Sequence, residues 1–162
     1  MHPYKSIALG LLIAAIDLRL NGFDLIVDAI GWFIVLQALD QLTRQVHPAF
    51  LPARTAALVA GLVSLTDLVG LGLPAPISFL LGLADVAAVW FVATAVMAVA
   101  SANGDERTDS LFNVLRWATV ATTALALAGV FVGGWVLVLF GLAVRIWLIV
   151  ELARAPEPAL TQ

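Results

Sequence analysis

Cysteine is absent from this 162-residue chain, and histidine occurs only twice, at His2 and His47. The absence of cysteine excludes disulfide bonds, thiolate nucleophiles and soft-metal clusters built by the chain itself. Two histidines, both in predicted termini or loops, are too few for a zinc or haem site, so we expect no metal site and no cofactor. The sequence also lacks a Ser-His-Asp arrangement, an HExxH motif and a glycine-rich phosphate loop.

Charge is scarce as well. Charged residues make up 12% of the chain, 62% of it is hydrophobic, and the mean hydropathy is +1.05. A soluble domain is typically about half apolar and about a quarter charged, so this composition disfavours a water-soluble fold. The net charge of −3 is too small to indicate a nucleic-acid partner. Composition therefore predicts a multi-pass membrane protein that is surrounded by membrane lipids.

Loop-forming residues divide the chain into six apolar segments, at about 5–20, 24–42, 53–71, 77–100, 111–132 and 135–152. Each is close to the ~20 residues that a helix needs to cross a bilayer. The polar segment 101–110 is predicted to be a cytoplasmic loop, and 153–162, which contains Pro156 and Pro158, a cytoplasmic tail. We predict an all-α integral membrane protein, a single-domain bundle of six transmembrane helices.

Basic residues predict the orientation of this bundle. Six spans place both termini on one side, and that side carries Lys5, Arg44, Arg54, Arg107, Arg116 and Arg154, whereas the other side carries only Arg19. The positive-inside rule therefore predicts cytoplasmic termini and three outward-facing helical hairpins. We interpret the first segment as a retained helix, because Asp17 and Asn21 stand where a signal peptide needs small residues for cleavage.

Acids within the apolar segments are the strongest functional signal. The expected solute- or ion-binding residues are Asp17, Asp24, Asp28, Asp67, Asp85 and Arg145, and the five aspartates all fall in the outer half of the predicted bundle. An ionised group at the centre of a membrane helix costs roughly 2.5–3.5 kcal/mol on insertion scales, so such groups mark functional sites by default. Asp24 and Asp28 are four residues apart and are expected on one face of the second helix. The alternatives are a helix cap for Asp24 and an outer ion pair between Asp17 and Arg19.

Asp85 and Arg145 are the most deeply placed of these charges. They lie at nearly the same predicted depth, in the fourth and sixth segments. Because an isolated charge would be far costlier than a pair, we predict that the two side chains face the bundle interior and interact. Such a pair either fixes helix packing alone or lines a cavity whose occupancy changes with substrate or proton.

Other polar residues are expected to have structural roles. Asp40 lies near Gln37, Gln41 and Arg44 and is predicted to form an ion pair at the inner interface. A further set can bond to the carbonyls of its own helices and requires no other role: Ser64, Thr66, Thr119, Thr122 and Thr123.

The stretch from Ile16 to Trp32, IDLRLNGFDLIVDAIGW, contains Asp24, Asp28, Gly31 and Trp32 in a D-x(3)-D-x(2)-G-W pattern. It resembles a hairpin found in small bacterial multi-pass membrane proteins of unassigned function. Those proteins often have proline where this chain has Val27. The resemblance covers the first two helices and implies a bacterial cytoplasmic-membrane location, but no activity.

Three classes of function fit these features. The first is a protein that binds or transports a small solute, a cation or protons, similar in architecture only to the substrate-binding subunits of energy-coupling-factor importers. The second is an intramembrane enzyme acting on a lipid or isoprenoid, with Asp28, Asp67 or Asp85 as general acid, as in small membrane terpene cyclases. The third is a non-catalytic scaffold or accessory subunit, which would act as a homo-oligomer or with a partner subunit.

Overall fold

The computed structural model describes residues 2–15, 19–20, 23–24, 27–68, 75–129 and 135–156. These form six α-helices, a short 3-10 helix and two strands of two residues each: α1 (Pro3–Ala15), β1 (Arg19–Leu20), β2 (Phe23–Asp24), α2 (Val27–Gln45), η1 (Pro48–Phe50), α3 (Leu51–Leu68), α4 (Ala75–Ala102), α5 (Glu106–Gly129) and α6 (Trp135–Arg154). The predicted six-helix, α-helical fold is confirmed.

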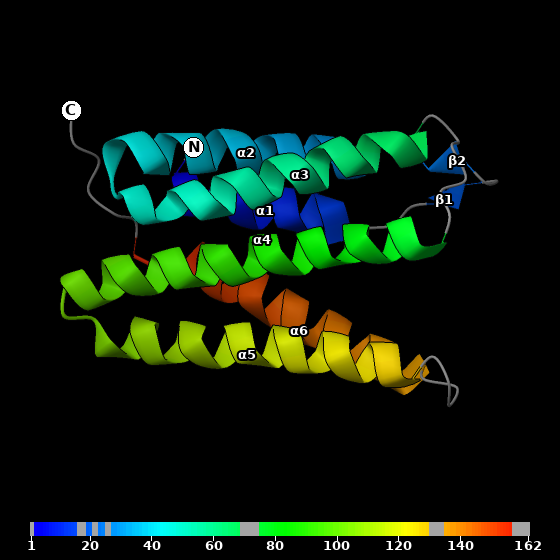
Figure 1. The fold of residues 1–162 in the computed structure, drawn as a ribbon. Helices are drawn as coiled ribbons and strands as arrows, with labels where there is room; N and C mark the ends of the chain where they lie inside the picture. The colour runs from blue at the N-terminus through cyan, green and yellow to red at the C-terminus, as the bar shows by residue number, and fades with distance from the viewer. Residues whose placement is uncertain are drawn as a thin grey trace.

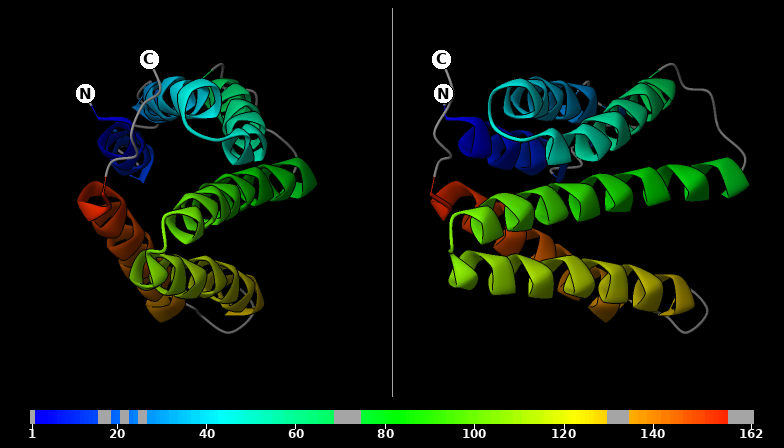
Figure 2. Two further views of the ribbon diagram at one scale, coloured as in Figure 1. Left: turned by 90° about the vertical axis from the view of Figure 1, so that its left-hand side faces the viewer. Right: turned by 60° about the vertical axis from the view of Figure 1, so that its left-hand side comes forward.

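The helices alternate in direction and form a ring (Figures 1 and 2). Each helix contacts its neighbours in sequence, and α1 also contacts α6, which closes the ring. α1 begins and α6 ends at the same end of the bundle, here called the terminal end. The opposite end carries β1 and β2 and is called the hairpin end. The arrangement places the start of α1, the end of α6 and the α2–α3 and α4–α5 connections at the terminal end, as the sequence predicts.

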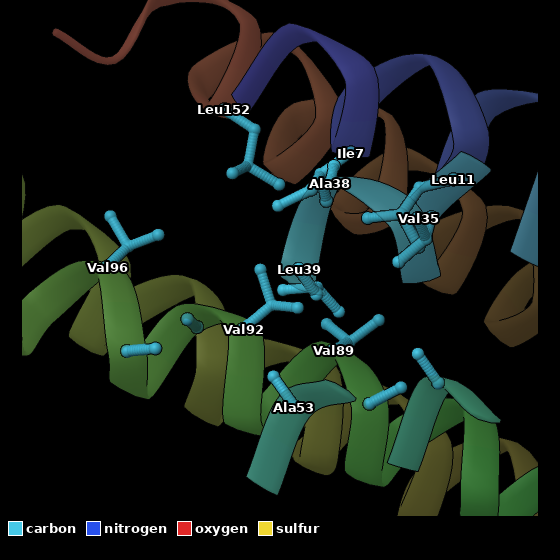
Figure 3. Close-up of a cluster of buried hydrophobic side chains, with 14 of the residues drawn as sticks. Ile7, Leu11, Val35, Ala38, Leu39, Ala53, Val89, Val92, Val96 and Leu152 are labelled. Atoms are coloured by element: carbon cyan, nitrogen blue, oxygen red, sulfur yellow. The ribbon is translucent and has the colours of Figure 1, made fainter. Parts of the chain in front are cut away.

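A single apolar core fills the ring (Figure 3). Side chains from all six helices contribute, and the largest fully buried ones are Phe50, Phe112, Ile7, Leu11, Leu39, Leu42, Leu115, Leu148 and Leu152. Among the residues whose burial the structure describes, Thr122 is the one buried polar side chain. The helix interfaces are therefore held mainly by van der Waals contact rather than by polar networks.

Two predictions at the first hairpin are wrong. The helix predicted at 5–20 ends earlier, because Arg19 and Leu20 pair with Asp24 and Phe23 in an antiparallel ladder. The helix predicted at 24–42 begins instead at Val27 and runs to Gln45. Asp24 is thus on a strand and does not share a helical face with Asp28. The sequence between the strands, Asn-Gly, is the combination that most favours a two-residue hairpin connection, and this preference outweighs the apolar periodicity.

The predicted loop 101–110 is also wrong over most of its length. α4 continues to Ala102, and α5 starts at Glu106 rather than at 111. Asp105 explains the early start, because its Oδ1 accepts the backbone N–H of Thr108 at 3.1 Å and its Oδ2 accepts the Thr108 hydroxyl at 2.6 Å. This is an N-cap, and the acids that follow in the first turn, Glu106 and Asp109, favour the positive end of the helix dipole.

In the part of the chain that is described, two stretches are long and apolar enough to cross a membrane by length and composition. They are Pro48–Leu65 and Leu83–Ala102.

Candidate functional site

Asp85 of α4 and Arg145 of α6 form a two-pronged ion pair. Arg145 donates from Nη1 to Oδ2 of Asp85 at 2.6 Å and from Nη2 to Oδ1 at 2.8 Å. Asp85 lies ten residues after Ala75, the first residue of α4, and Arg145 lies ten residues after Trp135, the first residue of α6. The predicted contact is therefore confirmed, and the two residues lie equally far from the starts of their helices. This parallel geometry is the strongest arrangement available to a guanidinium and a carboxylate.

The pair lines a cavity of about 370 Å³ between four helices. Its walls come from α1 (Ala14, Ala15), α4 (Asp85, Val86, Val89), α5 (Thr119, Thr122, Thr123) and α6 (Gly141, Leu142, Arg145). The side chain of Asp85 is 31% exposed and that of Arg145 is 24% exposed, so the pair faces this space rather than sealed protein. A volume of this size is within the range of cavities that hold small molecules.

Three threonines of α5 add a row of hydroxyls to one wall. Each donates to its own helix: Thr119 to the carbonyl of Leu115 at 2.9 Å, Thr122 to that of Ala118 at 2.8 Å, and Thr123 to that of Thr119 at 2.9 Å. The predicted backbone bonds are thus confirmed. Once its hydrogen is used in this way, each hydroxyl oxygen presents acceptor lone pairs to the cavity. Sequence reasoning did not foresee that these hydroxyls share a site with Asp85.

The Asp85–Arg145 ion pair determines the electrostatic character of the described cavity. Both carboxylate oxygens of Asp85 already accept hydrogen bonds from Arg145, so the two charges largely cancel. The Nε of Arg145 is buried and donates to no acceptor among the described residues. A buried donor left without a partner costs free energy, roughly 1–3 kcal/mol or more for a charged group. The cavity therefore combines little net charge with the hydroxyl acceptors of the three threonines.

The sequence predicts that the five aspartates gather around one site, but they do not all line the described cavity. Asp85 is the one acid that lines it, and Asp28, in the first turn of α2, is half-buried elsewhere. Asp24 lies on β2. Asp17 lies outside the described residues, and so does the side chain of Asp67, although its backbone belongs to α3. Among the described residues, no group of three metal-ligating side chains comes together.

An apolar layer separates this cavity from the terminal end. The layer consists of Leu11, Val92, Leu115 and Leu148, one from each cavity-lining helix, and all four side chains are fully buried. Leu11 and Val92 are labelled within the core in Figure 3. Below the layer lies a second space of about 420 Å³, whose lining includes His47, Asn103, Asp105 and Thr108. These buried side chains lie along their helices between the residues that line the two spaces.

Asp40 has a separate role near the terminal end. It pairs with Arg44 one turn later on α2, at 2.9 Å, and with Arg54 of α3, at 3.0 Å. The predicted interfacial ion pair is confirmed, and Arg54 is a partner that the sequence did not identify. Because Asp40 is one-third exposed and bridges two helices, its position indicates a structural contact between α2 and α3.

Neither a family model, nor a curated protein, nor a solved structure matches this chain.

Proposed function

We propose that this chain is a six-helix integral membrane protein that binds a small polar solute in the Asp85 cavity. The membrane part of the proposal is supported by the outer surface of the bundle. Large apolar side chains are exposed on every helix, including Leu12, Phe33, Leu62, Phe91, Trp117, Leu139 and Phe140. A helix that is apolar on all faces belongs in a large core or in lipid, and a ring of six such helices has no larger core to enter.

The distribution of charge supports one orientation. Lys5, Arg44, Arg54, Arg107 and Arg154 lie in the first or last turns of their helices, at the terminal end. The positive-inside rule then assigns the terminal end to the cytoplasm and the hairpin end to the outer face. In this orientation the Asp85 cavity is in the outer half of the bundle, and the apolar layer blocks it from the cytoplasm.

The ion pair within a cavity is the observation that carries the binding function. A pair that served packing alone would be expected in a filled interface, whereas this one faces about 370 Å³ of space beside three hydroxyls. Two cancelling charges give little attraction for a bare cation or anion. Acceptors from Thr119, Thr122 and Thr123 favour a solute rich in hydroxyl or amide donors. We therefore propose a neutral or zwitterionic polar solute.

Asp85 is poorly arranged for the enzymatic alternative. A general acid must carry a proton to donate, but both oxygens of Asp85 are occupied as acceptors by Arg145. The geometry of the cavity therefore supports solute binding. Acid catalysis by Asp85 would first require its ion pair with Arg145 to break.

Native mass spectrometry of the purified protein is the direct test. We expect a small polar molecule to be retained by the wild type and its occupancy to fall about threefold to tenfold in Thr122→Val, which removes one hydroxyl at constant shape. Thr43→Val is the matched control, since Thr43 makes the same bond to its own helix at 2.7 Å on α2, outside the cavity lining. Equal retention in both variants, or no solute in the wild type, would contradict the proposal.

A further inference from the structure

Arg116 of α5 has surroundings unlike those of the arginines paired with acids. Its guanidinium carbon lies 4.7 Å from the centre of the Trp90 ring, in a cation–π arrangement, and its Nη1 donates to the hydroxyl of Thr94 at 3.4 Å. Trp90 in turn meets Trp117 edge to face, with ring centroids 5.0 Å apart. The guanidinium therefore lies over one tryptophan, which a second tryptophan from α5 contacts edge to face.

This guanidinium has no counter-ion in the part of the chain that is described. Arg44, Arg54, Arg145 and Arg154 each pair with a carboxylate there, but no carboxylate lies within ion-pair distance of Arg116. Its Nε is buried without an acceptor, and the Oδ1 of Asn113, one turn earlier on the same face, is buried without a donor. Cation–π attraction offsets only part of the cost of such a charge. Among the residues that the structure describes, the charge of Arg116 is therefore not balanced by a carboxylate.

The position of Arg116 along α5 corresponds to a membrane interface. The first two turns of the helix, from Glu106 to Asn113, are rich in polar residues, and the continuous apolar face begins at Val114. Val114 and Trp117 are 53% and 56% exposed, on the outer surface. Tryptophan is enriched where hydrocarbon meets headgroups, and the long side chain of an arginine such as Arg116, ten residues into α5, can extend toward the phosphates.

We propose that Arg116, which lies over the Trp90 ring, binds the phosphate of an anionic phospholipid in the cytoplasmic leaflet. The phosphate oxygens accept from the Nη hydrogens of Arg116 that Thr94 does not use. Arginine binds phosphate by parallel, charge-assisted hydrogen bonds, so the guanidinium chemistry matches this ligand. The inference rests on the membrane location in the proposed function but not on the solute cavity.

Lipid titration monitored by native mass spectrometry tests this site. Phosphatidylglycerol and phosphatidylcholine with identical acyl chains are added to the purified protein, and the wild type is expected to bind phosphatidylglycerol about tenfold more tightly. Arg116→Gln should abolish that preference, and Arg116→Lys, which keeps the charge but loses the planar fork, should retain part of it. Arg154→Gln is the control, because Arg154 is an exposed cation at the terminal end that already has Glu151 as a partner at 3.8 Å.

Three results would overturn the inference. The first is equal binding of the two lipids by the wild type, and the second is a preference that survives in Arg116→Gln. The third is displacement of the lipid by inorganic phosphate at equal concentration, which would identify a site for soluble anions instead. Because neither lipid titration nor Arg116 involves the Asp85 cavity, a failure here leaves the Thr122→Val comparison unaffected.

Discussion

The backbones of α1 and α2 meet at Gly10 and Gly31. A Cβ atom added to Gly10 would lie 2.6 Å from the carbonyl oxygen of Gly31, and one added to Gly31 would lie 2.5 Å from the carbonyl oxygen of Gly10. These distances are too short for any side chain, and the atoms met are backbone, which cannot rotate away. Small residues at such crossings allow close van der Waals contact where no hydrophobic driving force separates helix from lipid.

Gly31→Ala should therefore destabilise the bundle. We expect a loss of about 1–3 kcal/mol, the usual cost of overpacking, and a lower midpoint of thermal unfolding in detergent. Gly141→Ala is the control, since its added Cβ would come no closer than 3.9 Å to the Cβ of Thr122. Similar midpoints for the two variants would show that α1 and α2 do not approach as closely as the structure indicates.

Removing one charge of the Asp85–Arg145 pair should lower the free energy of unfolding more than removing both charges does. Asp85→Asn leaves the Arg145 guanidinium without a counter-ion, and the loss for breaking a buried pair is about 3–5 kcal/mol as an upper bound, since both side chains are partly exposed. The double variant Asp85→Asn/Arg145→Gln should unfold at a higher temperature than either single variant. Additive losses would indicate that the two charges are not coupled.

The natural absence of cysteine allows single introduced thiols to test the proposed membrane orientation. Thr123→Cys, at a half-buried position that lines the cavity, should react with a membrane-impermeant thiol reagent added at the outer face, and Asn103→Cys should react only with reagent at the cytoplasmic face. Leu148→Cys, within the apolar layer, should react from neither side because that position is fully buried. Labelling of Leu148→Cys from both sides would mean that the layer does not close the cavity.

Asp105 should make stability depend on pH at the start of α5. Its pKa is lowered from the usual range, chiefly by the hydroxyl of Thr108 and next by the Thr108 backbone N–H, both of which bond to the ionised form. A lowered pKa in the folded state contributes stability above the ordinary aspartate value of about 4, and this contribution is lost as pH falls through the folded pKa. Thermal midpoints measured from neutral to acidic pH should show this loss in the wild type and a weaker one in Asp105→Ala.

Asp109→Asn is the matched control for this pH dependence. It removes a carboxylate from the same turn of α5 and leaves the cap in place. Equal flattening of the pH profile in both variants would assign the effect to general charge rather than to the cap.

Several features could be predicted from residue patterns because each has a local cause or a high energetic cost. The lengths of the apolar runs predicted six helices, and the cost of isolated charges in an apolar bundle predicted the contact between Asp85 and Arg145. Helix ends were less predictable. The Asp105 cap and the Asn-Gly connection are short-range signals, and they compete with an apolar periodicity that does not itself specify an end.

The amino-acid sequence alone determined how many helices form, that they alternate in direction, and which two opposite charges meet. The reason is that burial of apolar surface and the cost of an unpaired charge act on any arrangement of these segments. The rotation of each helix about its axis was decided only in three dimensions, where Gly10 and Gly31 bring backbones together and neighbouring helices compete for contact. That rotation turned Thr119, Thr122 and Thr123 toward Asp85, left Asp28 outside the cavity, and placed Arg116 against Trp90. No local pattern specifies it, since these helices are apolar on nearly every face.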